Sequence, residues 1–210
     1  YYDYFFIDEV QDIAGHDFNL LLAIIPNQCD SLFVGDFYQH TFDTSYDGQT
    51  NISLYNDYGK YIKRWQKGGV IIDTASLCKT HRCSKQICEF VCKMGIAIKS
   101  TEVAQGNVHY ITNEQESDSI LMNPLIPKLF YECSHDYNCN AINWGASKGI
   151  NDFVDVCVIL NKSTDDLFRN NRLQKMNPRT KNKLYVACTR PHRHLYIIPS
   201  RLAKKFKKTN

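Results

Sequence analysis

The sequence has no apolar run long enough to cross a membrane. Its longest run, Leu20 to Pro26, has the length of a core helix, whereas a transmembrane helix needs about 18 apolar residues. A secretory signal is also missing, because the opening segment contains Asp3 and Asp8 and no positive charge. We therefore expect a chain without a membrane partner or a leader peptide.

A strong excess of one charge sign is absent as well. The 210 residues include 25 Lys and Arg against 22 Asp and Glu, a net charge of +3, which does not by itself predict nucleic-acid binding. Hydrophobic residues make up 43% and charged residues 22%, as in ordinary soluble globular proteins. Repeats and low-complexity stretches are missing, so disorder, collagen and coiled coil are excluded, and the length predicts one or two domains.

A disulfide framework is absent although the chain contains nine cysteines. Their odd number and scattered positions indicate free thiols in a reducing setting, and we expect a cytoplasmic protein. Four of them lie close together in the sequence: Cys78, Cys83, Cys88 and Cys92. Structural zinc usually takes cysteine pairs roughly two to four residues apart on turns, whereas Cys88 and Cys92 fall within a helical pattern. Core thiols are therefore favoured over a metal site.

Short apolar runs alternate with helical patterns along the chain. Strands are predicted at Tyr4–Ile7, Ser31–Val34, Val70–Ile72 and Val154–Leu160, with weaker candidates at Val108–Ile111 and Ser119–Met122. Helices are predicted at Phe18–Ile25, Ile52–Trp65 and Lys85–Met94, and residues 112–118 are expected to form a polar loop. This alternation favours an α/β fold with parallel sheets. Ligands bind such sheets at the carboxyl ends of the strands, where Asp8, Asp36 and several later polar residues fall.

The first predicted strand is apolar throughout and ends in two adjacent acids, Asp8 and Glu9. Such a pair suits metal-assisted phosphoryl transfer, in which one carboxylate holds Mg²⁺ and the other orients or deprotonates an attacking water. The alternative is a strand end with solvated acids. The four preceding apolar residues, together with Gln11 and Asp12, favour the chemical interpretation.

The second predicted strand ends in Gly35-Asp36, and Gln39 follows three residues later. A glutamine amide can hydrogen-bond both a water and a phosphate oxygen without adding charge. We therefore expect Gln39 to lie near a phosphate bound at the first strand.

Five ordered segments resemble the motifs of the UvrD-like superfamily 1 helicases. DEVQD and GDxxQ, 22 residues apart, resemble motifs II and III. LCKTHRCS at 77–84 is similar to motif IV, WGASKGINDF at 144–153 to motif V, and YVACTRPHRHLYII at 185–198 to motif VI. The resemblance covers nearly the whole chain. It implies RecA-like (P-loop NTPase) parallel sheets and an ATP-dependent helicase or translocase working on single-stranded DNA.

The resemblance also implies the cofactors, ATP and Mg²⁺, and roles for individual residues. Asp8 and Glu9 would hold the metal, and Glu9 would be the catalytic base. Gln39 would couple the γ-phosphate to the DNA groove, and Arg82 and Arg190 would be arginine fingers. The remaining ATP contacts would be His81, Gly149 and Asp152. The DNA contacts would be Phe42, Asn143, Ser147 and Lys148, and a nuclease is a candidate protein partner.

Several positions depart from the family pattern, chiefly on the DNA side. Thr80 and His81 replace Asn and Tyr in motif IV, and Asn143 and Gly145 stand where Thr and His are common in motif V. Thr44 occupies the place of a base-stacking aromatic. These departures support an alternative, a helicase-like interaction module that binds a protein or nucleic acid without ATPase activity.

The phosphate-binding signature GxxxxGK[ST] is missing, since the only Gly-Lys pair is Gly59-Lys60. Only 59 residues separate motif IV from motif V, which leaves no room for a large accessory domain. We therefore expect the C-terminal portion of a compact family member, catalytically silent alone. Residues 1–68 would be part of a first RecA-like domain, and 69–210 a nearly complete second one.

Overall fold

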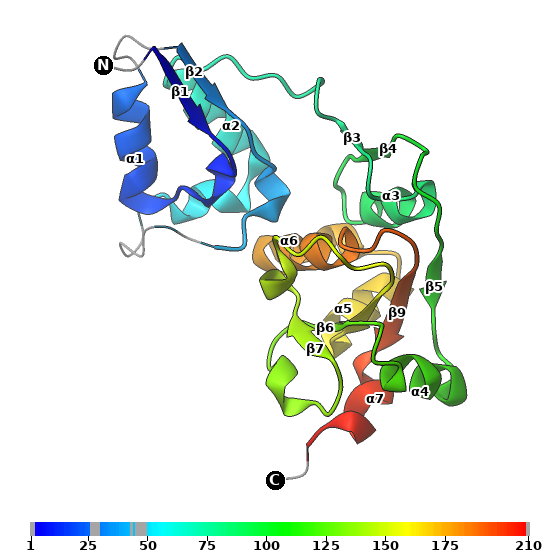
Figure 1. Ribbon diagram of the computed structural model, residues 1–210. Helices are drawn as coiled ribbons and strands as arrows, with labels where there is room; N and C mark the ends of the chain where they lie inside the picture. The colour runs from blue at the N-terminus through cyan, green and yellow to red at the C-terminus, as the bar shows by residue number, and fades with distance from the viewer. Residues whose placement is uncertain (1–2, 26–29, 43, 45–49, 209–210) are drawn as a thin grey trace. The chain divides into compact units, whose positions relative to one another are not determined.

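The computed structural model describes residues 3–25, 30–42, 44 and 50–208 (Figure 1). The chain forms two compact units, Tyr1–Ser76 and Leu77–Asn210. Their boundary lies eight residues after the predicted one at 68/69. Each unit has its own strands, helices and apolar core.

The first unit is built on two parallel strands, β1 (Tyr4–Ile7) and β2 (Asp30–Phe33). Phe6 of β1 is paired with Leu32 of β2. The helices and 3-10 turns around them are η1 (Val10–Asp12), α1 (Gly15–Ile24), η2 (Phe37–Gln39), η3 (Ile52–Asn56) and α2 (Tyr58–Lys67). The predicted strands at Tyr4 and Ser31 are thus confirmed in position and in their parallel pairing.

Only one face of this strand pair is covered. Phe5, Ile7 and Phe33 pack against the core formed with α1 and α2, where Phe18 and Trp65 are buried. The side chains on the opposite face are exposed: Tyr4 63%, Phe6 68% and Leu32 57%. The apolar sequences of both strands predict burial on both faces, and this prediction is wrong for the described part of the chain. Alternate residues of a strand point to opposite faces, and the helices cover only one of them.

The predicted helix over Ile52–Trp65 is divided into η3 and α2 at Asp57. Asp57 has extended dihedral angles (φ −144°, ψ 106°), and its carboxylate accepts a hydrogen bond from the Lys60 backbone N–H at 3.0 Å. It is therefore the N-cap of α2 rather than an interior residue. The strand predicted at Val70–Ile72 is not formed, because the Val70 N–H bonds back to the Trp65 carbonyl at 3.3 Å.

The second unit contains a five-stranded sheet in which all strands are parallel, in the order β5-β9-β8-β6-β7. The strands are β5 (Val108–Tyr110), β6 (Lys128–Phe130), β7 (Ala141–Asn143), β8 (Val156–Leu160) and β9 (Leu195–Pro199). A separate parallel pair is formed by β3 (Lys79–Thr80) and β4 (Lys99–Ser100). The helices are α3 (Lys85–Cys92), α4 (Glu114–Met122), α5 (Lys162–Arg169), α6 (Pro178–Cys188) and α7 (Ser200–Ala203).

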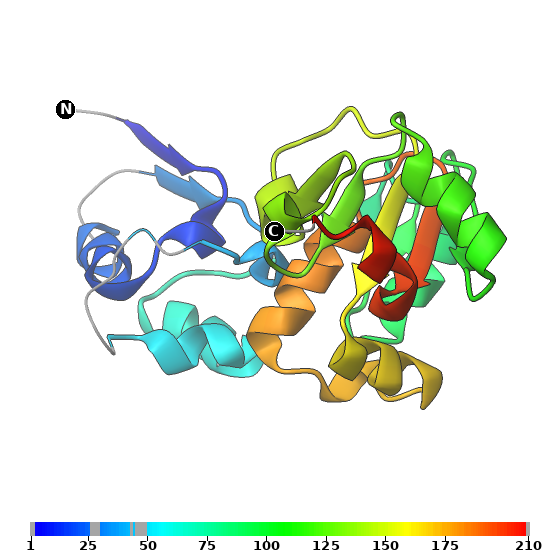
Figure 2. The ribbon, with the colours of Figure 1, turned by 90° about the horizontal axis from the view of Figure 1, so that it is seen from below.

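Helices cover both faces of this larger sheet. Residues of α4 and α7 share a core with Phe130, Cys157 and Ile159 on one face, and Figure 2 shows α7 lying against the strands. The other face is covered by α3, α5 and α6. All five residues of β8 are buried. Burial on both faces is normal for parallel sheets with crossover helices and confirms the predicted α/β class.

One predicted strand of the second unit is a helix. Ser119–Met122 forms the end of α4, which begins inside the segment predicted as a polar loop. The Asn113 side chain accepts a hydrogen bond from the Glu116 backbone N–H at 3.1 Å and caps this helix. Ile120 and Leu121 then enter the core on the same side of α4. The polar residues are therefore the outer face of an amphipathic helix.

The strands β6 and β7 were not predicted, like the short strands β3 and β4, and each of β6 and β7 carries a polar residue. Lys128 of β6 is fully buried, and its ammonium donates a hydrogen bond to the Asn123 carbonyl. Burial lowers the pKa of this lysine. Asn143 ends β7 and accepts a hydrogen bond from the Ser134 N–H at 2.9 Å. Both polar groups thus obtain partners that are not evident from the sequence.

The cysteine cluster is divided between core and surface. Cys83 and Cys88 are buried as expected, but Cys78 and Cys92 are exposed, so the core-thiol prediction is half wrong. Burial raises the pKa of Cys88 to about 12. Within residues 3–25, 30–42, 44 and 50–208, no group of three or more potential metal ligands is assembled. No helix within those same ranges is long and apolar enough to span a membrane.

Candidate functional site

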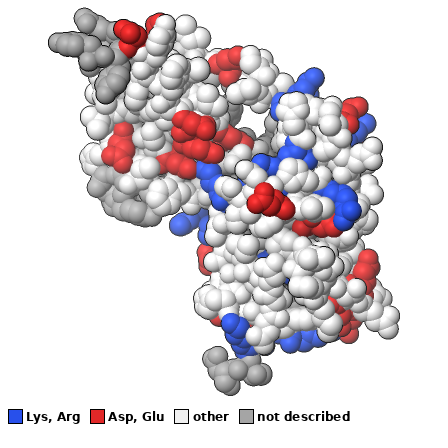
Figure 3. All heavy atoms as spheres, viewed as in Figure 1, with Lys and Arg blue, Asp and Glu red and all other residues white. Residues whose placement is uncertain are grey.

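The two acids that follow β1 are both exposed, and Figure 3 shows acidic side chains gathered on the surface of the first unit. Glu9 adopts a left-handed conformation (φ 53°, ψ 38°), which is uncommon for a residue other than glycine. Its backbone N–H donates a hydrogen bond to Asp8 Oδ1 at 2.8 Å. This turn ends the strand and starts η1, so both carboxylates lie at the carboxyl end of β1, as predicted from the sequence.

Gln11 joins this turn to the end of the neighbouring strand. Its side chain is almost completely buried, with 1% exposed. The amide Nε2 donates a hydrogen bond to the Glu9 carboxylate, and the amide Oε1 accepts one from the Asp36 backbone N–H at 3.0 Å. A glutamine can do both because it carries a donor and an acceptor on the same group. It therefore fixes the Glu9 carboxylate relative to the loop after β2.

Gly35 allows the two loops to approach closely. The Val10 backbone N–H donates to the Val34 carbonyl at 3.0 Å, which continues the pairing of the strands into the loops. A Cβ atom on Gly35 would lie 2.3 Å from Gln11 Oε1 and 3.1 Å from the Val10 nitrogen. A larger residue there would displace the buried amide.

Asp36 carries the hydrogen-bonded chain from Gln11 to Gln39. Its Oδ1 accepts from the Tyr38 N–H at 3.0 Å and caps η2. Its Oδ2 accepts from the Gln39 amide Nε2 at 3.1 Å. Glu9, Gln11, Asp36 and Gln39 thus form one connected series, which we call the strand-end network. The sequence predicted its two ends but not the two positioning residues between them.

Phe42 and Thr44 follow this network in the chain. The Phe42 ring is 55% exposed. The Thr44 hydroxyl accepts a hydrogen bond from the Ala14 N–H at 3.0 Å, and the Thr44 N–H donates to the Asp12 carbonyl at 3.2 Å. Thr44 therefore fastens its loop to the segment before α1, which is a structural role at the position where the family pattern has an aromatic residue.

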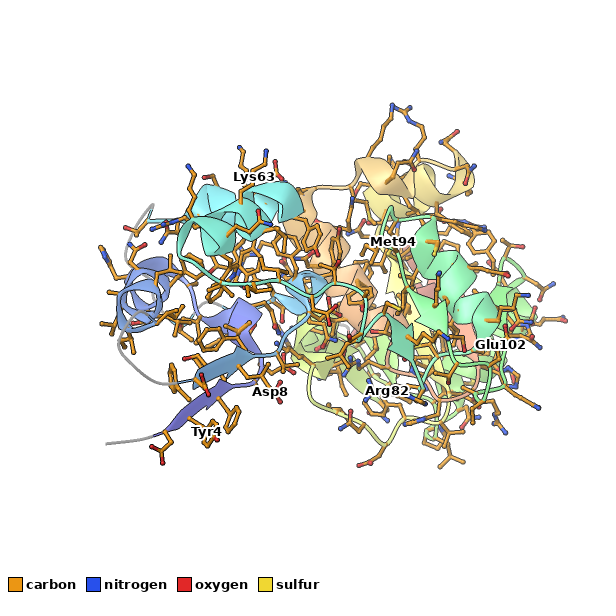
Figure 4. The ribbon with its side chains drawn as sticks, turned by 90° about the horizontal axis from the view of Figure 1, so that it is seen from above. Tyr4, Asp8, Lys63, Arg82, Met94 and Glu102 are labelled. Carbon is orange, nitrogen blue, oxygen red and sulfur yellow. The ribbon has the colours of Figure 1, made fainter. Side chains whose placement is uncertain are left out.

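In the second unit, Arg82 lies in the turn between β3 and α3 (Figure 4). Its Nη2 donates to Asn151 Oδ1 at 2.6 Å, and its Nε is buried without a hydrogen-bond partner among the described residues. The backbone carbonyl of Asn151 lies 2.7 Å from His192 Nε2. Asn151 therefore ties the segments of motifs IV, V and VI together. Asp152, the predicted ribose contact, follows Asn151 and is exposed. His81, which precedes Arg82, is also exposed.

Arg190 follows the C-terminus of α6 and is buried, with 3% exposed. Its Nε donates to the Val186 carbonyl at 3.1 Å. The Cys83 thiol donates to the Thr189 carbonyl at 3.7 Å, so the residues adjacent to the two arginines touch each other. Burial raises the pKa of Cys83, while a hydrogen bond from Thr80 and the charges of Arg82 and Arg190 oppose that shift.

Asn151 and Arg190 lie at the amino ends of β8 and β9, whereas Arg82 follows the carboxyl end of β3. Residues 151–155 lead directly into β8, and residues 189–194 lead directly into β9. The His192 N–H donates to the Phe153 carbonyl at 3.0 Å, which holds the two lead-in segments together. The carboxyl-end expectation therefore holds for Asp8 and Asp36 in the first unit, whereas in the second unit Arg82 follows the carboxyl end of β3 and Arg190 lies at the amino end of β9.

The motif V residues lie on the turn after β7. Ser147 is fully buried, and its hydroxyl donates to the Trp144 carbonyl at 2.7 Å. Lys148 is half-buried, and Gly149 is exposed with φ +81°, a conformation that a residue with a Cβ rarely adopts. Asn143 lies at the end of β7 with its side chain bonded to Ser134. This turn contacts α6, which carries motif VI.

The sequence matches no protein-family model, and no curated protein matches it. The structure is similar to that of a PRRSV helicase, with a TM-score of 0.53 and 16% identity over 98% of this chain and 37% of that one. This chain therefore spans little more than a third of that helicase. The likeness establishes a RecA-like α/β fold, with a five-stranded parallel sheet in the second unit, and confirms the predicted fold class.

Two further solved structures have lower scores. A second structure of the PRRSV helicase, nsp10, has a TM-score of 0.37 and 18% identity over 98% of this chain and 38% of that one. The C-terminal domain of a possible DNA helicase from Lactobacillus plantarum WCFS1 has a TM-score of 0.35 and 14% identity over 61% of this chain and 94% of that one. Scores of this size do not establish a shared fold.

Proposed function

We propose that this chain is part of an ATP-dependent helicase or translocase of the UvrD-like type that moves along single-stranded DNA. The strand-end network carries the proposal. It holds one carboxylate, Glu9, and one amide, Gln39, at the ends of adjacent parallel strands. If ATP hydrolysis is coupled to movement, the catalytic base and the amide that contacts the phosphate must be held at fixed positions relative to each other.

The first unit is proposed to belong to a larger RecA-like domain. Tyr4, Phe6 and Leu32 expose one face of a parallel strand pair, whereas parallel sheets are normally covered on both faces. A phosphate-binding loop of the GxxxxGK[ST] type is not among the 210 residues. Hydrolysis would therefore need a loop from outside this sequence, and the chain alone is expected to be silent.

The carboxylates of the first unit fit a magnesium ion. Mg²⁺ prefers oxygen ligands and is usually held by one or two carboxylates together with substrate phosphates. Asp8 and Glu9 are exposed, and Asp8 Oδ2 has no hydrogen-bond partner among the described residues. When bound, the ion would supply charge neutralisation at the phosphates. Glu9 would accept a proton from water, and Gln11 would orient its carboxylate.

Arg82 and Arg190 are proposed to stabilise the developing charge on the phosphate. A guanidinium stays charged and can donate to two phosphate oxygens at once. Asn151 holds one arginine and the α6 backbone the other. An arginine finger contributes about 10³–10⁵ in rate.

The remaining nucleotide and DNA contacts are proposed from the resemblance to the UvrD-like helicases. Near the nucleotide they are His81, Gly149 and Asp152, and near the DNA they are Phe42, Asn143, Ser147 and Lys148. The Ser147 hydroxyl already bonds to Trp144, so its part would be to hold the turn that presents Lys148. A nuclease as protein partner and a cytoplasmic location remain part of this proposal.

The test is ATP hydrolysis by the polypeptide encoded by the complete natural reading frame. We expect hydrolysis that single-stranded DNA stimulates. Glu9→Gln should lower kcat by about 10²–10⁴, and Arg190→Ala by about 10³–10⁵. Asp73→Asn is the matched control, because Asp73 is exposed and its carboxylate only caps the following turn.

Turnover that neither Glu9→Gln nor Arg190→Ala changes would contradict the proposal. A wild-type protein that binds DNA or a protein partner but hydrolyses no ATP would instead support the alternative, an interaction module without ATPase activity. The departures from the family pattern in the DNA-side motifs favour that alternative, while the strand-end network favours the motor.

A further inference from the structure

The basic residues of the first unit are all on one helix. Residues 1–76 contain eleven acidic side chains and only four basic ones, a formal charge of −7. The four basic residues are Lys60, Lys63, Arg64 and Lys67, and all lie on α2. A unit that is otherwise acidic thus concentrates its entire positive charge within eight consecutive positions.

These four side chains form the outer surface of α2. Tyr61 and Trp65 on the inner side are 5% and 4% exposed and pack around Phe18. Lys60, Lys63 and Lys67 are exposed, and Figure 4 shows Lys63 directed away from the helix. Each residue of a helix rises 1.5 Å, so Lys60 and Lys67 are about 10 Å apart along the axis. We call this surface the α2 basic face.

Nothing described in the structure neutralises the α2 basic face. None of its four side chains forms an ion pair or hydrogen bond with a described residue, and α2 itself contains no acid. Between Thr50 and Ile72 the only acid is Asp57, whose carboxylate caps the Lys60 N–H.

Helix stability does not explain this arrangement. The macrodipole favours positive charge in the last turn, where Arg64 and Lys67 lie, but disfavours it in the first turn, where Lys60 lies. The spacings within the face are three and four residues, at which like charges repel. An uncompensated row of this kind is consistent with an anionic partner.

An exposed aromatic ring lies at the start of the same helix. Tyr58 is 39% exposed and stacks on Tyr38, with ring centroids 5.9 Å apart and planes inclined by 28°. Tyr38 belongs to η2, the turn that also carries Gln39 of the strand-end network. Tyr58 precedes Tyr61 and Trp65 by three and seven residues, so its ring lies on their side of α2, and the inference rests on the charges of the basic face.

We propose that the α2 basic face binds the phosphate backbone of a single-stranded nucleic acid. This goes beyond the proposed function, whose DNA contacts are Phe42, Asn143, Ser147 and Lys148, none of them on α2. It shares with that function only the class of ligand. Lys60, Lys63 and Lys67 contact successive phosphates, and Arg64 supports them from the side of the helix. Phosphate contacts of this kind give affinity without sequence preference.

The experiment is a salt titration of binding to fluorescent oligothymidylate and oligouridylate of roughly 20 nucleotides, without nucleotide or metal. Each phosphate contact on a single strand contributes about 0.7 to the slope of log Kd against log salt. The triple variant Lys60→Gln/Lys63→Gln/Lys67→Gln should therefore lower that slope by about 2. Correspondingly, the wild-type affinity should fall about 20-fold more than the variant's between roughly 50 and 200 mM salt.

Two matched control variants test whether the effect comes from the charges on α2 or from the net charge of the chain. Lys93→Gln/Lys162→Gln/Lys175→Gln removes the same charge from exposed sites of the second unit and should leave the slope nearly unchanged. Lys60→Arg/Lys63→Arg/Lys67→Arg retains the charge and should keep the wild-type slope. Circular dichroism melts confirm that all variants are folded.

An unchanged slope in the Lys60/Lys63/Lys67→Gln variant would overturn the inference, as would an equal loss in the control triple. Binding of that surface to an acidic polypeptide or an anionic vesicle, but not to either oligonucleotide, would also overturn it. Lys148→Gln is measured in parallel. If only Lys148→Gln lowers the slope, the inference is wrong and the proposed function stands. If only the Lys60/Lys63/Lys67→Gln variant lowers it, the inference stands and the proposed DNA contact of Lys148 is wrong.

Discussion

The two units of this chain differ in charge and in how their sheets are covered. Residues 1–76 carry a formal charge of −7, whereas residues 77–210 carry 21 basic and 11 acidic residues, a formal charge of +10. The first unit exposes one face of a two-stranded sheet, while the second buries both faces of a five-stranded one. The near-neutral total of the whole sequence conceals this contrast.

The difference has a chemical counterpart in the candidate residues. The first unit offers carboxylates and amides, which suit a metal and a water. The second offers guanidinium groups, which suit phosphate. The contrast also predicts unequal stability, because a sheet covered on both sides removes more apolar surface from water per residue. Each unit contains one buried tryptophan, Trp65 and Trp144, so single-tryptophan backgrounds can report each unit separately.

The largest expected effect is a loss of core packing in the second unit. Ile197→Ala removes a fully buried side chain from β9 and should lower the unfolding free energy of that unit by about 2–5 kcal/mol. The matched Leu32→Ala in β2 removes a side chain that is 57% exposed and should cost less than about 0.5 kcal/mol. Urea unfolding followed by Trp144 and by Trp65 fluorescence measures the two effects.

A similar cost for both substitutions would refute the contrast in coverage. A large cost for Leu32→Ala would mean that the exposed face of β1 and β2 is covered in solution.

Substitutions in the strand-end network should have the next largest effect on stability, and this effect should be confined to the first unit. Gly35→Ala places a Cβ against Gln11 Oε1 and the Val10 nitrogen and should destabilise the Trp65 transition by about 1–3 kcal/mol. Gln11→Ala should cost about 1–3 kcal/mol as well, because it leaves the Asp36 N–H without its partner. Neither variant should move the Trp144 transition. A shift of both transitions would show that the units unfold together.

The unfolding free energy of the second unit should fall at acid pH because the Asp155 carboxylate becomes protonated. The hydrogen bonds from Arg193 hold the pKa of Asp155 below its ordinary value, with help from the His194 N–H. A carboxylate of lowered pKa stabilises the fold above its unfolded pKa, about 3.9, and that contribution disappears as the pH falls through the folded value. Asp155→Asn should cost about 1–2 kcal/mol at neutral pH.

The same variant should lose the pH dependence that the wild type shows below roughly pH 4. The measurement is urea unfolding of the Trp144 reporter across that range. If wild type and Asp155→Asn kept parallel pH profiles, the ion pair with Arg193 would not be the source of the effect.

The smallest expected effect concerns the hydrogen bond between Arg82 and Asn151. Asn151 is exposed, so Asn151→Ala should change the unfolding free energy of the second unit by less than about 0.5 kcal/mol. The Trp144 transition measures this directly, with Asn170→Ala on the exposed end of α5 as control. A loss well above that of the control would make Asn151 a structural residue instead of a holder for a ligand-binding arginine.

The positions of most apolar elements could be predicted from the sequence, but their surroundings could not. Val156–Leu160 is a strand because five apolar, mostly β-branched residues favour one. Ser119–Met122 was ambiguous by the same measure, because a short apolar run fits either a strand or the buried side of a helix. The cap at Asn113 and the packing of Ile120 decided for the helix.

The candidate site shows the same division. Glu9, Gln39, Arg82 and Arg190 were found from motif patterns, since each lies in a segment with a recognisable local signature. Gln11 and Asp36 also lie inside those motifs, yet their function as positioning residues depends on a contact across 25 positions of sequence. Asn151 meets Arg82 across 69 positions. No local pattern encodes such pairings.

The sequence by itself determined the chemical groups, their order and the parallel α/β class, because these follow from residue types and their periodicity along the chain. Only the tertiary structure decided that one face of β1 and β2 is exposed, that Asn151 bonds to Arg82, and that Gln11 joins Glu9 to Asp36. It also decided that the cations of α2 share one uncompensated surface. Burial and hydrogen bonding depend on which distant segments pack together, and that is settled only when the whole chain has folded.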